Sequence, residues 1–289
     1  MKKSRTFDVV VIIMFAALAL LTLYPFYNVI ILSFSNTESV AKHIPYLLPF
    51  ALDLTGYKTI IQDSDFINSL LVSLFVTIAG TAVNMVLSVI AAYVLSRKYL
   101  DGRNMIMSVI VFTMLFGGGL VPTYMVIKDM GLINKVWAMI LPTAINTYYL
   151  IIMKNYFLGL PDGLFEAAKL DGAGEWTMLW KVAFPLSKPI MATFTLFYAV
   201  DRWNEWYNAL LYINKKALSP LQIYLRDILT SLNSQLSTQA QQMMGSTQKV
   251  STSAVQMATI VITALPIMLV YPYLQKYFVN GVMVGGIKE

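Results

Sequence analysis

A run of charged, amide and aromatic residues interrupts an apolar part of the chain at positions 201–208, which read Asp-Arg-Trp-Asn-Glu-Trp-Tyr-Asn. Charged groups inside an apolar helix are costly, so they should face a cavity or one another. Arg202 and Glu205 stand three residues apart on one helical face, and we expect them to form an ion pair. Flat aromatic rings cover the apolar faces of sugar rings, while amides and carboxylates bind hydroxyls. The run therefore suits a neutral, polyhydroxylated solute, with Trp203, Asn204, Glu205, Trp206 and Tyr207 as candidate contacts.

The same run has a second interpretation. The clean apolar stretch before it, residues 190–200, is too short to cross a bilayer by itself. If the helix leaves the membrane early, Trp203, Trp206 and Tyr207 form an aromatic belt at the membrane surface. If the helix continues to residue 211, its outer half carries the charges. Both interpretations stay open at this stage.

A second polar island lies at residues 161–189, between two apolar segments. Pro161 suits the first turn of a helix, where a missing N–H costs nothing, and apolar residues follow it at helical spacing on one face. Gly172 stands where a helix would end in a left-handed cap. We predict a helix from Pro161 to about Asp171, a sharp turn, and a second short helix over residues 176–182 that Pro185 stops.

This island resembles the EAA loop of ABC importer permeases, the transmembrane subunits of binding-protein-dependent uptake systems. The residues in register with that pattern are Glu166, Ala167, Ala168, Asp171, Gly172, Ala173, Pro185 and Pro189. Leu179, Val182 and Phe184 depart from it by apolar exchanges. The resemblance implies that residues 161–171 form a coupling helix that sits in a groove of a cytoplasmic ATPase. The residues that it assigns to ATPase coupling are Glu166, Ala167, Ala168, Asp171, Gly172 and Pro185.

The composition indicates an integral membrane protein, because 57% of the residues are hydrophobic and only 12% are charged, against about 25% charged in soluble domains. The chain contains no cysteine and a single histidine, so it offers no thiol nucleophile and no cysteine-based metal site. We assign no role to His43. The net charge of +6 belongs to no groove-reading motif, and we expect no nucleic-acid partner.

Apolar runs predict an all-α protein with six transmembrane helices in one permease domain, residues 1–289, with membrane lipid around it. The expected spans are residues 9–31, 67–95, 105–127, 136–153, 190–211 and 254–274. The first run follows a positive start as a signal peptide does, but it is long and lacks a small-residue cleavage site, which favours an uncleaved span. The coupling loop occupies residues 154–188, and a polar outer segment occupies residues 212–253.

The positive-inside rule orients these spans. Lysines and arginines concentrate at the N-terminus and in the connection at residues 97–103. This bias predicts a multi-pass protein of the cell membrane with both termini in the cytoplasm. The loop at residues 154–188 then also lies in the cytoplasm, where an ATPase would meet it.

Further resemblance concerns the solute. The Trp203-Asn204 pair, the long outer segment and the ending at residues 271–285 resemble carbohydrate-uptake permeases, similar to the second permease subunit of maltose-type systems. Residues 116–124, Phe-Gly-Gly-Gly-Leu-Val-Pro-Thr-Tyr, resemble a branch associated with oligosaccharides and polysaccharide fragments. This resemblance adds Tyr124 to the candidate path residues.

The sequence lacks a G-x-x-x-x-G-K-[ST] phosphate loop and any nucleophile beside a base, so we expect no enzyme activity, cofactor or metal on this chain. The resemblance implies that ATP and Mg²⁺ bind a partner. The implied partners are a second permease chain, two cytoplasmic ATPase subunits and an extracellular sugar-binding protein.

The expected function is ATP-driven import of oligosaccharides by alternating access. The nearest alternative is an ABC permease for a non-sugar solute. A second is an ion-coupled secondary transporter in which Asp201, Arg202 and Glu205 relay a proton or sodium ion, although six spans without an inverted repeat argue against it. A third is a sensor that binds without transport.

Overall fold

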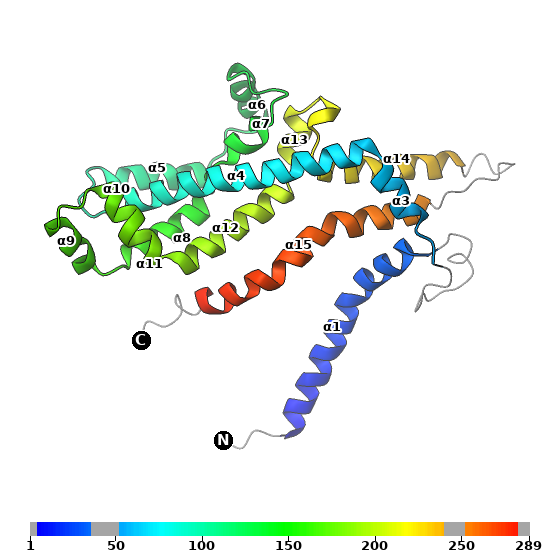
Figure 1. The fold of residues 1–289 in the computed structure, drawn as a ribbon, viewed down its shortest axis with the longest axis horizontal. Helices are drawn as coiled ribbons and strands as arrows, with labels where there is room; N and C mark the ends of the chain where they lie inside the picture. Colours follow the sequence, from blue (N-terminus) through cyan, green and yellow to red (C-terminus); the bar gives the residue numbers. More distant parts are fainter. Residues whose placement is uncertain (1–4, 36–51, 240–251, 283–289) are drawn as a thin grey trace. The chain divides into compact units, whose positions relative to one another are not determined.

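The structure is a computed structural model that describes residues 5–35, 52–239 and 252–282. Within these ranges the secondary structure is helical, apart from one bridge between Ser35 and Leu52 (Figure 1). The chain forms two compact units, residues 1–67 with 224–266 and residues 68–223 with 267–289. His43, residues 240–251 of the outer segment and residues 283–289 lie outside the described part of the chain.

Among the residues that the structure describes, two helices are long and apolar enough to cross a membrane. Helix α1 covers Arg5–Ser33, and α4 covers Ser64–Ser96. At about 1.5 Å per residue, both exceed the roughly 30 Å of a hydrocarbon core. They contain the stretches 9–31 and 67–95, so the predicted helices are confirmed there. A third candidate is the pair α5 (Arg103–Leu115) and α6 (Leu120–Asp129), if the pair counts as one bent span.

The first unit contains α1, α3 (Thr55–Gln62), most of α14 (Leu221–Gln239) and the first half of α15 (Thr252–Val282). The hydroxyl groups of Ser33 and Tyr57 lie 2.7 Å apart, so α3 is tied to the end of α1. The Tyr224 hydroxyl donates to Asp63 at 2.7 Å, which raises the pKa of Tyr224 together with burial, the larger cause. Within the predicted outer segment, α14 runs to Gln239, and its Arg226 and Asp227 are exposed.

The second unit holds both candidate sites. Its core joins α4 to α8 (Thr147–Leu158) and α12 (Lys188–Trp203) through fully or nearly fully buried side chains. Those with the least exposure include Val89, Leu150, Met153, Phe157, Phe194 and Tyr198. The same cluster reaches Phe165 of α9 (Asp162–Leu170), so the loop at residues 154–188 packs on the core of its own unit.

The spans predicted over residues 105–127, 136–153 and 190–211 are each divided into shorter helices. The sequence predicts the interruption at the glycines of the first and leaves the end of the third open. The chain bends by 116° between α5 and α6, at the glycines of residues 117–119, where Gly119 has φ +86°. Pro142 ends α7 (Trp137–Ile140) in a short 3-10 turn before α8 starts. Helix α12 stops at Trp203, and α13 (Tyr207–Tyr212) follows it. Glycine allows the first break because it adopts a positive φ without strain, and proline favours the second because it lacks an N–H donor.

The expected stop at Pro185 is wrong. The second arm of the loop begins with α10 (Glu175–Thr177), continues as a π-helical turn over Met178–Ala183 and enters α11 (Phe184–Leu186). Pro185 lies in the first turn of α11, where its missing N–H is tolerated. The helical run therefore passes through this proline and ends only at Ser187.

Candidate functional site

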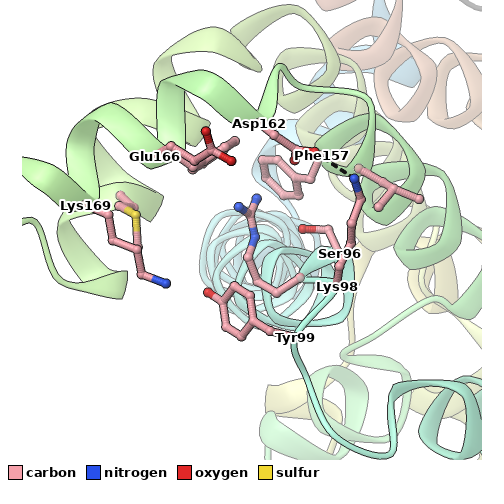
Figure 2. A pocket seen from close by; sticks show the side chains of 11 residues that line it. Ser96, Lys98, Tyr99, Phe157, Asp162, Glu166 and Lys169 are labelled. Atoms are coloured by element: carbon pink, nitrogen blue, oxygen red, sulfur yellow. Dashed lines mark hydrogen bonds and ion pairs between the residues drawn. The ribbon is translucent and has the colours of Figure 1, made fainter.

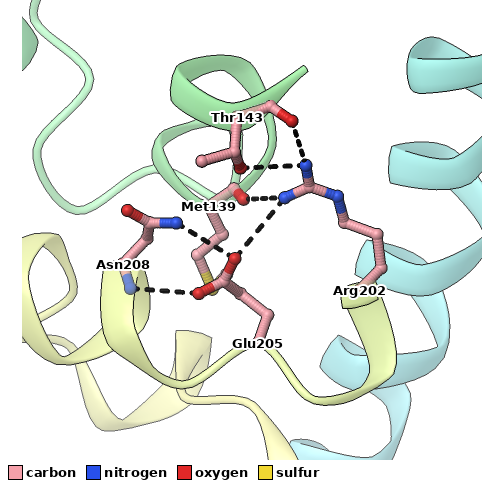
Figure 3. A network of polar contacts seen from close by, with 5 residues as sticks. All are labelled: Met139, Thr143, Arg202, Glu205 and Asn208. Carbon is pink, nitrogen blue, oxygen red and sulfur yellow. Dashed lines mark hydrogen bonds and ion pairs between the residues drawn. The ribbon is translucent and has the colours of Figure 1, made fainter. Parts of the chain in front are cut away.

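Arg202, at the end of α12, binds the backbone on both sides of the break in residues 136–153. Its guanidinium donates to the carbonyl of Met139 at 2.6 Å, and to the carbonyl and hydroxyl of Thr143 at 2.6 and 2.9 Å (Figure 3). A break in a helix leaves carbonyl groups without backbone donors, and a membrane interior offers no water to replace them. Arg202, which is only 3% exposed, supplies those donors.

The predicted ion pair between Arg202 and Glu205 is confirmed, with the charged atoms 3.5 Å apart. The Glu205 carboxylate also accepts from the backbone N–H and the side-chain amide of Asn208, each at 3.0 Å, and so caps α13 (Figure 3). In the amide orientation that satisfies its neighbours, Asn84 of α4 accepts from Arg202 Nε at 3.1 Å and Nη2 at 3.0 Å. These contacts occupy the guanidinium on all sides. We call Arg202, Glu205, Met139, Thr143 and Asn208 the arginine node.

A cavity of about 620 Å³ opens beside the arginine node. Its polar lining comes from three elements and consists of Thr143, Asn146, Thr147, Tyr148, Tyr198, Asp201, Arg202 and Glu205. The Tyr198 hydroxyl is fixed by Ser88 at 2.7 Å and by the backbone N–H of Asn146 at 3.1 Å. The Asp201 carboxylate is exposed and accepts from Tyr149 at 3.1 Å. Hydroxyl, amide and carboxylate groups therefore face one space, which suits a polar solute.

Of the path residues predicted from the sequence, only one lines this cavity. Glu205 lines it, but Trp203 is 5% exposed and packs inside the unit. Asn204, Trp206 and Tyr207 are exposed outside the cavity lining, and Tyr124 stacks on Tyr212 with ring centroids 5.9 Å apart. The sequence prediction missed the lining residues after Pro142. Their signal was a proline followed by polar residues inside an apolar run.

The loop at residues 154–188, for which the resemblance implies a coupling role, has the predicted helix–turn–helix form. Gly172 has φ +79°, which confirms the left-handed cap, and the N–H of Ala173 closes the turn on the Ala168 carbonyl at 2.9 Å. Phe165 is buried, whereas the residues that the resemblance assigns to coupling are mostly exposed: Glu166, Ala167, Asp171, Gly172 and Pro185, with Ala168 half-buried. Two large apolar side chains also point outward, Leu170 at 90% and Trp176 at 63% exposure.

The end of α4 lies against this loop around a small pocket of about 280 Å³ (Figure 2). The Lys98 ammonium group and the Asp162 carboxylate lie 2.7 Å apart. The lysine's hydrogen bond and charge hold the pKa of Asp162 below its usual range. Both side chains are largely exposed, so the pair adds little to stability. Within the part of the chain that the structure describes, no three carboxylate, histidine or cysteine residues gather to hold a metal ion.

A helical membrane protein with broken spans around a polar cavity, and with an exposed helix–turn–helix loop, has the features of a transport permease. The chain matches the family described as "Binding-protein-dependent transport system inner membrane component" over residues 9–284, and it belongs to that family. It is therefore a membrane-bound permease subunit of an ABC importer and not an enzyme, since ATP hydrolysis in this family resides on a separate chain.

Two relatives from Bacillus subtilis (strain 168) are each 42% identical to this chain. One is Protein LplC, matched over 99% of this chain and 96% of its own length. The other is the polygalacturonan/rhamnogalacturonan transport system permease protein YtcP, matched over 99% of each chain. A crystal structure of a bacterial ABC transporter involved in the import of the acidic polysaccharide alginate superposes with a TM-score of 0.87 and 32% identity. It covers 96% of this chain and 99% of that one.

Proposed function

We propose that this chain is one of two permease subunits of an importer for oligosaccharides. The observation that carries the proposal is the cavity of about 620 Å³, lined by hydroxyl, amide, carboxylate and tyrosine groups. Such groups bind the hydroxyls and ring faces of a sugar. Relatives with sugar polymers or oligosaccharides in their names support the same class.

The proposed membrane topology has six spans, with the broken segments 105–127, 136–153 and 190–211 counted as one span each. Irregular backbone at membrane depth is tolerated where it lines a cavity or is buried in protein, and the arginine node provides such burial. The last span is α15. The positive flanks favour cytoplasmic termini and a cytoplasmic coupling loop.

The proposed partners are those of an ABC importer. A second permease completes the pathway, and two ATPase subunits bind ATP and Mg²⁺. Helix α9 presents Glu166 and Leu170 to the ATPase, with Glu166 pairing with a basic group and Leu170 entering an apolar groove. An extracellular sugar-binding protein delivers the solute. A solved alginate transporter in complex with a pentasaccharide-bound periplasmic protein shares the fold of this chain, with a TM-score of 0.56.

The proposed mechanism is alternating access. ATP binding closes the ATPase dimer, the coupling loop moves with it, and the cavity beside the arginine node changes the side to which it opens. An ion-coupled mechanism requires a carboxylate that gains and loses a proton during the cycle. Glu205 is held by Arg202 and Asn208, which argues against that role for Glu205.

The test is purification of the chain from membranes in mild detergent, followed by ATPase and uptake assays on the reconstituted complex. We expect a second permease and an ATPase to co-purify, with ATPase activity that rises when a binding protein and an oligosaccharide are added. If a non-sugar solute stimulates the ATPase activity and an oligosaccharide does not, the importer is specific for that other class of solute. Recovery of the chain alone, with uptake driven by an ion gradient, would overturn the proposal.

A further inference from the structure

Arg97, the first residue after α4, connects that helix to the coupling loop through two aromatic rings. Its guanidinium carbon lies 4.4 Å from the ring centre of Tyr93 in α4 and 3.9 Å from the ring centre of Phe165 in α9. A cation over an aromatic face is attracted by the negative charge of the ring face, and more strongly where it is shielded from water. The Arg97 Nε atom is buried and has no hydrogen-bond partner, and the guanidinium contacts both rings.

Glu175 ties the other arm of the loop to the same end of α4. Its two carboxylate oxygens accept from the Tyr93 hydroxyl at 2.9 Å and the Tyr99 hydroxyl at 2.5 Å. Burial and the neighbouring Glu175 raise the pKa of Tyr99 to about 12. Tyr99 therefore stays a neutral donor at physiological pH. Tyr93 therefore binds the second arm directly through Glu175 and is linked to Phe165 of the first arm through Arg97, which contacts both rings.

Two exposed contacts complete this region. Lys98 binds Asp162 in the first turn of α9, and the Lys169 ammonium group lies 4.8 Å from the Tyr99 ring centre. Residues 93–99 therefore touch the start, the middle and the end of α9, and also the first turn of α10. We call these contacts the α4 joint. A loop held at four places is fixed in orientation as well as in position.

The same helix also contacts the arginine node. A Cβ atom added at Gly80 would lie 2.8 Å from Arg202 Cδ, and Asn84 binds the guanidinium. Gly80 and Ser96 are joined by unbroken helix, roughly 24 Å long at about 1.5 Å per residue. A displacement of one end of this segment therefore reaches the other.

We infer that the coupling loop and α4 move as one rigid body, with Arg97 and Glu175 as the positioning residues that lock them together. This inference rests on the proposed function. It adds that α4 carries the motion of the ATPase to the arginine node and its cavity. The loop is then not a hinged lever but a fixed extension of the helix that borders the solute pathway.

A cross-link across the α4 joint tests rigidity directly. The chain contains no cysteine, so the double variant Lys98→Cys/Asp162→Cys introduces the only thiols on it. A short bis-maleimide joins them in the reconstituted complex, with each single variant treated identically as a control. We expect the cross-linked complex to keep sugar uptake and stimulated ATPase activity near those of the untreated complex. Uptake that stops in the cross-linked complex, but not in the controls, overturns the inference.

A second set of variants tests the locking contacts. Tyr93→Phe/Tyr99→Phe removes both hydroxyls bound to Glu175 and keeps both rings. Arg97→Gln removes the cation, and Arg97→Lys retains it. We expect the tyrosine double variant and Arg97→Gln each to lower uptake per ATP hydrolysed by roughly five-fold, with complex recovery and basal ATPase activity unchanged. Arg97→Lys should keep most of the wild-type uptake per ATP. Unchanged uptake per ATP in both variants contradicts the inference. A wild-type complex without sugar uptake contradicts the proposed function instead.

Discussion

Arg202 donates to the carbonyl and the hydroxyl of Thr143 at 2.6 and 2.9 Å, although 59 residues separate them. This contact explains how a span broken at Pro142 remains compatible with a membrane interior. The break frees carbonyl groups, and the guanidinium has enough donors to bind several of them in fixed directions. The Glu205 carboxylate, 3.5 Å from the guanidinium, balances the positive charge of Arg202.

Replacement of Arg202 by methionine should destabilise the complex by about 3–5 kcal/mol, because Glu205 and the carbonyls lose their buried partner. The measurement is thermal unfolding of the purified complex. Arg226→Met is the matched control, since Arg226 is exposed on α14 and its replacement should change the melting temperature little. Addition of Glu205→Gln to Arg202→Met should recover part of the loss. Equal melting temperatures for Arg202→Met and the control would show that the node contributes no stability.

Gly80→Leu should disturb the same node, because a side chain at this position meets Arg202 Cδ. The guanidinium cannot retreat without losing its bonds to Met139 and Thr143. The double variant Gly80→Leu/Arg202→Met should therefore be less destabilised than the sum of the single variants. A double-mutant cycle on unfolding temperature measures this coupling. Strict additivity would mean that the two sites act independently.

Asp201→Asn should change the preference for charged solutes. Of the charged groups that line the cavity, Arg202 and Glu205 are engaged in the node, whereas Asp201 is exposed. Its carboxylate should repel a uronate oligosaccharide. We expect the variant to shift the ratio of uronate to neutral oligosaccharide uptake toward the uronate by roughly ten-fold.

Asp129→Asn, an exposed carboxylate outside the cavity lining, is the control for charge alone. The ratio should stay constant in this control. A ratio that also stays constant in Asp201→Asn would remove Asp201 from the solute pathway.

Gly172→Val should uncouple ATP hydrolysis from uptake. The φ of +79° at Gly172 costs a side chain about 1–2 kcal/mol, so the turn that positions α9 should change. Gly174→Val is the matched control, because Gly174 has φ −75° and open space around its Cβ position. Uptake is measured against the amount of protein in the membrane.

Glu166→Lys should uncouple transport through a different cause, since it reverses the charge proposed to meet the ATPase. It should leave the turn itself intact. If Gly172→Val and Glu166→Lys both keep normal uptake, the loop does not couple to the ATPase.

Loss of the ion pair between Lys98 and Asp162 should not change the pH profile of uptake between pH 6 and 8. The hydrogen bond from Lys98 lowers the pKa of Asp162. A lowered pKa gives a stabilising contribution that is complete above the ordinary carboxyl pKa of about 4 and is lost only as the pH falls below it. We therefore expect Asp162→Asn and the wild type to have profiles of the same shape. A profile that shifts in the variant would show that Asp162 titrates during transport.

Features that depend on residues close together in the chain could be predicted from the amino-acid sequence. Apolar runs without interruption predicted α1 and α4, because burial of backbone in lipid requires a helix of sufficient length. The cap at Gly172 and the pair of Arg202 with Glu205 were also predictable, since spacings within one or two helical turns fix them. The family could be inferred from the residues of the loop in register with its pattern.

Features that depend on contacts between distant residues could be seen only in the folded protein. The sequence predicted spans over residues 105–127, 136–153 and 190–211 and an interruption at the glycines of the first. It could not predict how the groups freed at a break are bound, because those partners lie on other helices. Burial of Trp203, the binding of Met139 and Thr143 by Arg202, and the contact of Arg97 with Phe165 all join segments far apart in the chain. A hydropathy pattern shows how apolar each residue is, but it does not show which distant residue each one contacts. For that reason the cavity and the α4 joint became visible only when the helices were packed together.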